Sequence, residues 1–190
     1  MKFSSTEKKD LLKAWLAISV AFAILTTHGF TISGFLTNFV LSAFTVGIAF
    51  LLHELGHKYL AQKYRCWAEF RAFDFMLFLA IAMSFFGFIF AAPGAVMIKG
   101  NITTSKNGKI SAMGPLVNLA LAVVFLGLFY LGLFTKLTFF GFYINSFIAL
   151  FNMLPFWEFD GAKIFAWNKA IYAGMVAAGL LFVAFAYSGF

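Results

Sequence analysis

The chain has 190 residues, of which 63% are hydrophobic, 21% aromatic and only 11% charged. An ordinary soluble domain has about 25% charged residues, so this composition excludes a typical soluble protein and indicates an integral membrane protein. A net charge of +7 could indicate nucleic-acid binding in a soluble chain. No basic run is interleaved with exposed aromatic residues, so we exclude a nucleic-acid partner and interpret the charge as a signal of membrane topology.

Five apolar stretches are long enough to cross a lipid bilayer as helices. They are roughly residues 11–27, 38–60, 110–134, 137–156 and 170–187. Lysines precede the first stretch, as in a signal peptide, but no convincing small-residue cleavage site follows, so we expect a retained anchor. We predict an all-α polytopic membrane protein with about five transmembrane helices. Residues 1–190 would form a single membrane-embedded domain without repeats or an appended soluble domain.

The second apolar stretch contains the sequence His-Glu-Leu-Gly-His at residues 53–57. Ionisable side chains at membrane depth are costly and persist mainly where they pair, bind an ion or face water. On a helix, His53 and His57 lie one turn apart and point to one spot, and Glu54 can reach a water on the same metal. This is the H-E-x-x-H arrangement of a zinc hydrolase, which predicts one Zn²⁺ per chain. The alternative is two structural histidines with Glu54 in a salt bridge.

The next apolar stretch, residues 75–98, is long enough to cross the bilayer but is interrupted. Gly87 and Pro93-Gly94 break its helical periodicity, and residues 95–98 have the pattern of a strand. We therefore expect a re-entrant segment with a short β-strand or hairpin between the second and third spans. Asn107-Gly108 is a hairpin signal that would pair this strand with residues near Lys109-Ile110.

The strand in this segment could accept an extended peptide by edge pairing. Gly94, Ala95 and Val96 are therefore candidate substrate-binding residues. Re-entry is also favoured by the basic residues, because it places all of them except Lys136 on the cytoplasmic side when the amino terminus is cytoplasmic. We expect a multi-pass protein, in the cell membrane, with its polar site toward the cytoplasm.

Two histidines leave a catalytic zinc ion one protein ligand short, and a carboxylate is an accepted third ligand. His28 lies near the outer end of the first span and is on the wrong side. Among the acids, Glu158 and Asp160 follow the fourth apolar stretch, and Asp160-Gly161 suits a tight turn that could aim a carboxylate back into the bundle. We choose Asp160. Re-entry of residues 75–98 is required here too, since His53 and Asp160 must be separated by an even number of crossings.

Three motifs together resemble those of the site-2 protease family of intramembrane zinc metalloproteases. They are His53-Glu54-Leu55-Gly56-His57, then Gly114-Pro115-Leu116-Val117-Asn118, similar to G-P-x-x-N, and finally Asn152-Met153-Leu154-Pro155 with Asp160-Gly161, similar to N-x-x-P-x-x-x-x-D-G. The resemblance covers about residues 38–163, the expected core, and leaves the spans at 11–27 and 170–187 as accessory. Ala162, where many members have a second glycine, and the Phe-rich residues 75–90 depart from the family pattern.

The resemblance implies zinc on His53, His57 and Asp160, with Glu54 as general base and a core of three helices. The expected activity is hydrolysis of a peptide bond within or near a transmembrane segment of a membrane-protein substrate. The amides of Asn118 and Asn152 are candidate oxyanion donors, although Asn also commonly forms hydrogen bonds between helices. The alternatives are a catalytically silent zinc-binding scaffold or chaperone and a metal transporter. The sequence specifies neither the substrate nor the oligomeric state.

Overall fold

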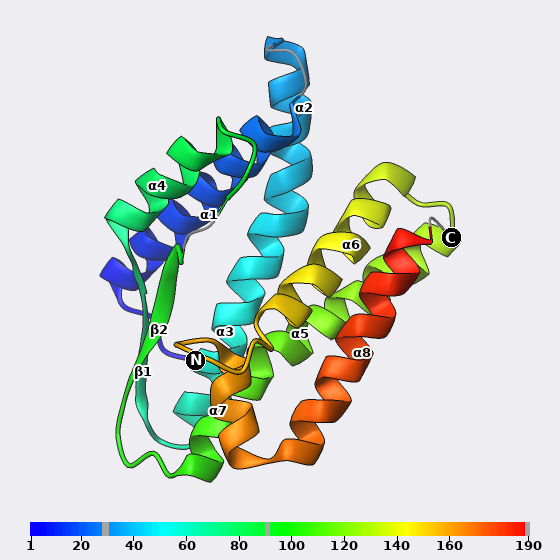
Figure 1. Ribbon diagram of the computed structural model, residues 1–190. Coiled ribbons are helices and arrows are strands. Elements are labelled where there is room, and N and C mark those ends of the chain that lie inside the picture. The colour runs from blue at the N-terminus through cyan, green and yellow to red at the C-terminus, as the bar shows by residue number, and fades with distance from the viewer. Residues whose placement is uncertain (28–30, 90–91, 189–190) are drawn as a thin grey trace. The chain divides into compact units, whose positions relative to one another are not determined.

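The computed structural model describes residues 1–27, 31–89 and 92–188, and the chain in these ranges is mostly helical. His28, which the sequence analysis set aside, lies outside the described residues. The helices and strands occur in the following order (Figure 1): α1 Ser5–Thr26, α2 Ile32–Ser42, the π-helix η1 Ala43–Gly47, α3 Ile48–Lys63, β1 Trp67–Ala72, α4 Asp74–Ser84, β2 Gly94–Lys99, α5 Thr104–Tyr130, α6 Thr135–Phe151, α7 Asp160–Trp167 and α8 Lys169–Tyr187.

Three helices in the described ranges are long and apolar enough to cross a membrane. They are the continuous helix Ile32–Lys63, which comprises α2, η1 and α3, then α5 and α8. The first and fourth predicted spans are also helices, α1 and α6, but α1 begins with charged turns and α6 has only 17 residues. At 1.5 Å per residue α6 is about 26 Å long, somewhat less than the thickness of a hydrocarbon core.

The described chain divides into two compact units, residues 1–51 with 69–97, and residues 52–68 with 98–190. In the first unit, α1 packs against α2, η1 and α4. Ser4 caps α1 by accepting a hydrogen bond from the Glu7 backbone N–H at 3.1 Å. The buried Glu7 carboxylate accepts a hydrogen bond from the Phe70 N–H at 2.9 Å, which ties α1 to β1. Ala14 and Leu77 form a small core with Phe70.

The two strands form one two-stranded sheet. β2 confirms the strand predicted within residues 75–98, and α4 occupies the first half of that stretch. The predicted strand partner near Lys109 is wrong, because those residues lie in α5 and β2 pairs with β1 instead. Asn107-Gly108 does not form a hairpin turn, because Thr103 starts a helix ahead of it by accepting a hydrogen bond from the Lys106 N–H at 3.3 Å.

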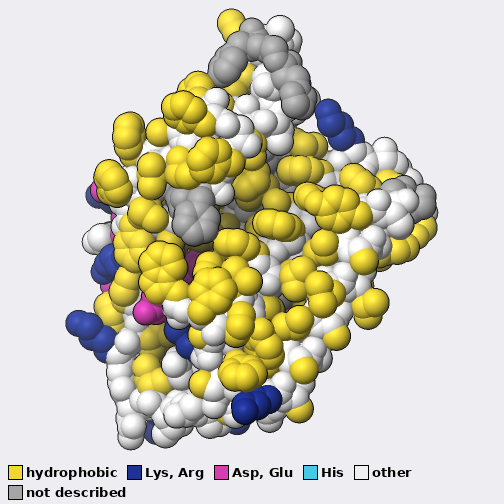
Figure 2. All heavy atoms as spheres, in the orientation of Figure 1, with side chains coloured by type: hydrophobic (Ala, Val, Ile, Leu, Met, Phe, Trp, Pro, Cys, Tyr) yellow, Lys and Arg dark blue, Asp and Glu magenta, His cyan; other side chains and the backbone are white. Residues whose placement is uncertain are grey.

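In the second unit, α5 packs against α6, α7 and α8, and α6 and α7 each pack against α8 (Figure 1). Ala112 of α5, Met153, Ile164 of α7 and Met175 of α8 form one buried cluster. A second cluster, Ala122, Phe142 and Ala186, joins α5, α6 and α8. Outside these cores many large apolar side chains are exposed, and Figure 2 shows them over most of the face in view. Such an apolar surface suits a protein surrounded by lipid.

Candidate metal centre

The second unit brings His53 and His57 of α3 together with Asp160, the first residue of α7. Asp160 Oδ2 lies 3.2 Å from His53 Nε2 and 3.2 Å from His57 Nε2. The three side chains are buried, with 4%, 8% and 8% of their residue surface exposed. Among the described residues they are the one group of histidine, cysteine and acidic side chains whose donor atoms lie close enough to hold a metal ion.

The directions of the two imidazoles show which ring nitrogens are free for a metal. His57 Nδ1 lies 2.8 Å from the backbone carbonyl oxygen of Ile110, and His53 Nδ1 lies 2.6 Å from Asn118 Oδ1. A carbonyl oxygen can only accept a hydrogen bond, so each Nδ1 carries the hydrogen and each Nε2 presents a lone pair. Contacts of this kind orient metal-binding histidines in proteins.

The spacing of the three donor atoms fits a tetrahedral zinc site. Ligands about 2.1 Å from a tetrahedral zinc ion lie about 3.4 Å from one another. The two separations from Asp160 Oδ2 are close to this value, and all three donor atoms lie within 4.8 Å of one another. Asp160 Oδ2 is buried and has no hydrogen-bond partner, and in neutral imidazoles with the hydrogen on Nδ1 neither Nε2 can donate to it. Three lone-pair atoms facing one another repel unless a cation lies between them. The residues therefore fit zinc, for which two imidazoles and a carboxylate are a known ligand set.

Helix α5 presents three positions, each one turn apart, to the imidazoles. Ile110 and Asn118 hold the two Nδ1 atoms, and Gly114 lies halfway between them. A Cβ atom added to Gly114 would lie 2.5 Å from His53 Nε2 and closer still to His57 Nε2. Only glycine therefore leaves the space in front of both Nε2 atoms open.

Asp160 is held in place by the glycine that follows it. The Gly161 N–H donates to the Asn152 carbonyl at 2.8 Å, and a Cβ on Gly161 would lie 2.7 Å from the Leu154 carbonyl oxygen. The start of α7 is thereby fixed against the end of α6. The Asp160 side chain is thereby held with its Oδ2 facing both imidazoles.

The other predicted site residues have the following surroundings. Glu54 is buried and follows His53 on α3. Asn118 Nδ2 donates to Asn145 Oδ1 at 3.1 Å, and Asn152 Nδ2 donates to the Ile148 carbonyl of its own helix at 2.9 Å. Both amides thus have structural hydrogen bonds, and their part in catalysis stays a prediction. The rejected alternative ligand, Glu158, has a side chain that is 88% exposed and pairs with Lys163.

Gly94, Ala95 and Val96, the predicted substrate-binding residues, lie in β2 and belong to the first compact unit. β2 is one strand of a two-stranded sheet, the kind of element to which an extended peptide can add. Their binding role stays a prediction.

Two groups near the imidazoles were not predicted from the sequence. They are the Ile110 carbonyl, which contacts His57, and the Asn145 side chain, which contacts Asn118. Every residue has a backbone carbonyl, so the sequence does not show which carbonyl contacts a histidine. Asn145 has a signal, a polar side chain in the apolar helix α6, but its link to His53 passes through Asn118, 27 residues away in the chain. The sequence therefore gives no indication of this contact.

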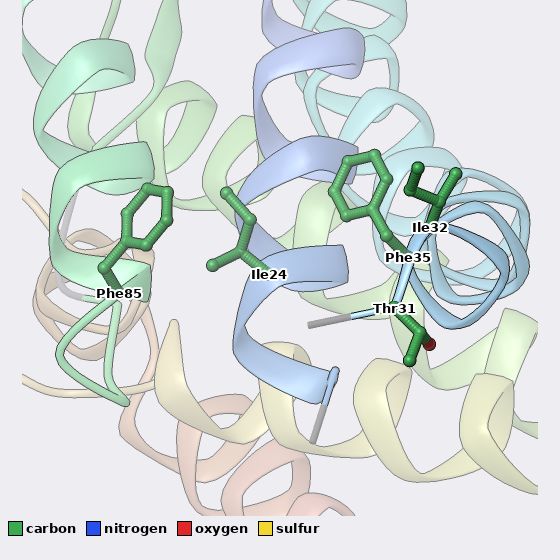
Figure 3. A pocket seen from close by; sticks show the side chains of 5 residues that line it. All are labelled: Ile24, Thr31, Ile32, Phe35 and Phe85. Atoms are coloured by element: carbon green, nitrogen blue, oxygen red, sulfur yellow. The ribbon is translucent and has the colours of Figure 1, made fainter. Parts of the chain in front are cut away.

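An open pocket of about 290 Å³ lies in the first unit (Figure 3). The described residues that line it are apolar apart from Thr31, whose hydroxyl accepts a hydrogen bond from the Gly34 N–H. The lining residues are Ile24, Thr31, Ile32, Phe35 and Phe85. None of these described lining residues carries a group suited to catalysis or metal binding, and none is a predicted site residue.

The comparisons with known proteins agree with the chemistry of this site. The chain is 43% identical over 178 residues to a protein of Methanocaldococcus jannaschii named "Putative zinc metalloprotease", and the match covers 90% of each chain. No family profile matches the chain, and no solved structure matches it. The relationship nevertheless extends over nearly the whole length of both proteins at high identity. The chain therefore belongs to the zinc metalloprotease family of this archaeal protein.

Proposed function

We propose that this protein is an intramembrane zinc metalloprotease of the site-2 type, which cleaves peptide bonds within or near transmembrane segments. The convergence of His53, His57 and Asp160 carries this proposal, because it occurs on a helix apolar enough to cross the membrane. His53 lies ten residues before the end of that helix at Lys63, about 15 Å along its axis. A metal site at that depth suits a substrate that is itself in the membrane.

In this proposal each chain holds one zinc ion on His53, His57 and Asp160. A bound zinc ion supplies Lewis acidity, which lowers the pKa of a water ligand to about 7 and polarises a carbonyl group. The Glu54 carboxylate accepts the proton of the attacking water and returns it to the leaving amine nitrogen. The amides of Asn118 and Asn152 are the candidate donors to the oxyanion.

The substrate is a transmembrane protein or peptide, whose cleaved segment must leave its helical conformation before the scissile carbonyl is accessible. We propose that it adds to β2 along Gly94, Ala95 and Val96 as an extended strand. Segments with helix-weakening residues near the cytoplasmic end should then be the preferred substrates. In this proposal the protein crosses the cell membrane about five times and its active site lies toward the cytoplasm.

The test is Glu54→Gln in proteoliposomes that contain a tagged single-span test substrate with Gly and Pro near the cytoplasmic end of its span. The wild type should cleave the substrate, stop when zinc is chelated and recover when zinc is restored. Glu54→Gln should still bind one zinc ion per chain but cleave about 10²–10⁴-fold more slowly, since the general base is lost. The matched control is Glu158→Gln, an exposed acid, which should behave as the wild type.

The possible outcomes separate the proposal from its alternatives. Unchanged cleavage by Glu54→Gln would show that Glu54 is not the general base. A wild type that binds zinc but cleaves none of a panel of such substrates would favour a silent zinc-binding scaffold. Zinc flux into the proteoliposomes without cleavage would favour a transporter.

A further inference from the structure

Beyond the three predicted metal ligands, a chain of buried hydrogen bonds runs from His53 into α6. His53 Nδ1 contacts Asn118 Oδ1 at 2.6 Å, Asn118 Nδ2 donates to Asn145 Oδ1 at 3.1 Å, and Asn145 Nδ2 donates to the Gly141 carbonyl at 2.8 Å. Asn118 and Asn145 are both fully buried, with 0% of their surface exposed. We define these four residues as the asparagine relay.

The direction of the asparagine relay is set at the end distant from the metal site. The Gly141 carbonyl can only accept, so the side-chain group of Asn145 that faces it must be the amide NH₂. Asn145 then turns its oxygen toward Asn118, which in turn must present its own NH₂ to Asn145 and its oxygen to His53. His53 must therefore carry its hydrogen on Nδ1 and leave Nε2 free.

We propose that Asn145 is a positioning residue for the zinc site, which fixes the tautomer and the ring orientation of His53 through Asn118. His57 needs no such device, because its Nδ1 meets the Ile110 backbone carbonyl directly. An Asn side chain, unlike a carbonyl, can face His53 with either its oxygen or its NH₂. The hydrogen bond from Asn118 Nδ2 to Asn145 Oδ1 selects the orientation in which the Asn118 oxygen faces His53.

The first test is Asn145→Leu, a substitution of similar size that removes both relay hydrogen bonds. Competition with a chromophoric chelator should show a zinc affinity that is lower by on the order of 10- to 100-fold, as is typical for loss of a group that orients a ligand. The matched control is Ser146→Ala. Ser146 is the next residue, is equally buried and bonds only the Phe142 carbonyl of its own helix in the contacts observed, so its loss should leave zinc affinity unchanged.

A second substitution separates positioning from general packing. Asn118→Asp, added to Asn145→Leu, places a carboxylate on His53 Nδ1, and a carboxylate can only accept. The double variant should regain zinc affinity, although it does not restore the packing at position 145. Should Asn145→Leu fail to fold, Asn145→Ser, which is too short to reach Asn118, should give the same loss of affinity and the same rescue.

The tautomer can also be observed directly, because the chain has only three histidines. In the metal-free protein with ¹⁵N-labelled histidine, NMR should show His53 protonated on Nδ1 in the wild type and a mixture of tautomers in Asn145→Leu. Equal zinc affinity and equal tautomers in the two proteins would overturn the proposal, as would a loss that Asn118→Asp does not rescue. The inference rests on the proposed zinc site but not on proteolysis. A wild type that binds no zinc would instead count against the proposed function.

Discussion

At the scale of single residues, the metal centre depends on what α5 presents to α3. Positions 110, 114 and 118 share one face of α5 because they are four residues apart. Two of them orient an imidazole each, and the third, Gly114, contributes only the absence of a side chain. The need for glycine at the first position of the G-P-x-x-N motif thus has a steric explanation.

Gly114→Ala should weaken zinc binding by at least about tenfold, because the new methyl group would occupy the space in front of both Nε2 atoms and displace the ligands. Gly127→Ala is the matched control, since Gly127 lies on the same helix and a Cβ there meets no atom within 4 Å. Zinc content after dialysis against graded chelator concentrations measures the difference. Equal retention by both variants would mean that the imidazoles or α5 can shift at little cost.

At the scale of helices, the contact between α5 and α6 positions much of the centre. Gly141 of α6 packs against the Phe125 ring of α5, where a Cβ would lie 2.5 Å from the nearest ring atom. Asn145 lies one turn further along α6, and the Asn152 carbonyl at its end holds Gly161. The middle of α6 therefore contacts the Asn118 side chain that faces His53, and the end of α6 holds the residue that follows Asp160.

Gly141→Ala should lower the free energy of unfolding by about 1–3 kcal/mol, because it overpacks this helix contact. Gly174→Ala on α8 is the control, since its Cβ would enter open space. Thermal unfolding of the zinc-free proteins in detergent compares the two without any contribution from metal binding. If both substitutions lowered the midpoint equally, the close approach of α5 and α6 at Gly141 would not be a source of stability.

Predictions from the sequence are correct where the interactions that decide a structure lie close together along the chain. The periodicity of residues 53–57 is local, so it correctly predicts that both histidines lie on one helical turn. The strand at residues 95–98 is likewise marked by its own residues, and β2 contains it. The partner of that strand depends on contacts between distant residues, which the local sequence does not encode. The helix that begins after the cap at Thr103 contains Asn107-Gly108, so the turn preference of these two residues is overridden. The asparagine relay also joins distant residues and leaves no local pattern.

At the scale of the whole molecule, the surface and the metal centre together restrict the topology. The 27 residues of α5 extend about 40 Å, enough to cross a bilayer with some tilt, and α6 packs along α5 after a short connection. α6 ends close to the start of α7, where Asp160 meets the imidazoles of α3. The beginning of α5 and α7 should therefore lie on the same side of the membrane, and the turn between α5 and α6 on the other.

Cysteine labelling in intact cells tests this arrangement with three exposed positions. In a Cys66→Ala background, which removes the chain's one cysteine, the variants are Ser105→Cys, Thr135→Cys and Ala166→Cys. A membrane-impermeant maleimide should label only position 135 in intact cells, and all three positions once the membrane is permeabilised. Positive charges favour this result, since Lys136 alone would face outside while the lysines near positions 105 and 166 face inside.

Labelling of position 105 but not of position 166 from outside would place Asp160 across the bilayer from the segment that leads into α5. Such a result could not be reconciled with a metal centre shared by α3 and α7 in a protein that re-enters the membrane between residues 75 and 98.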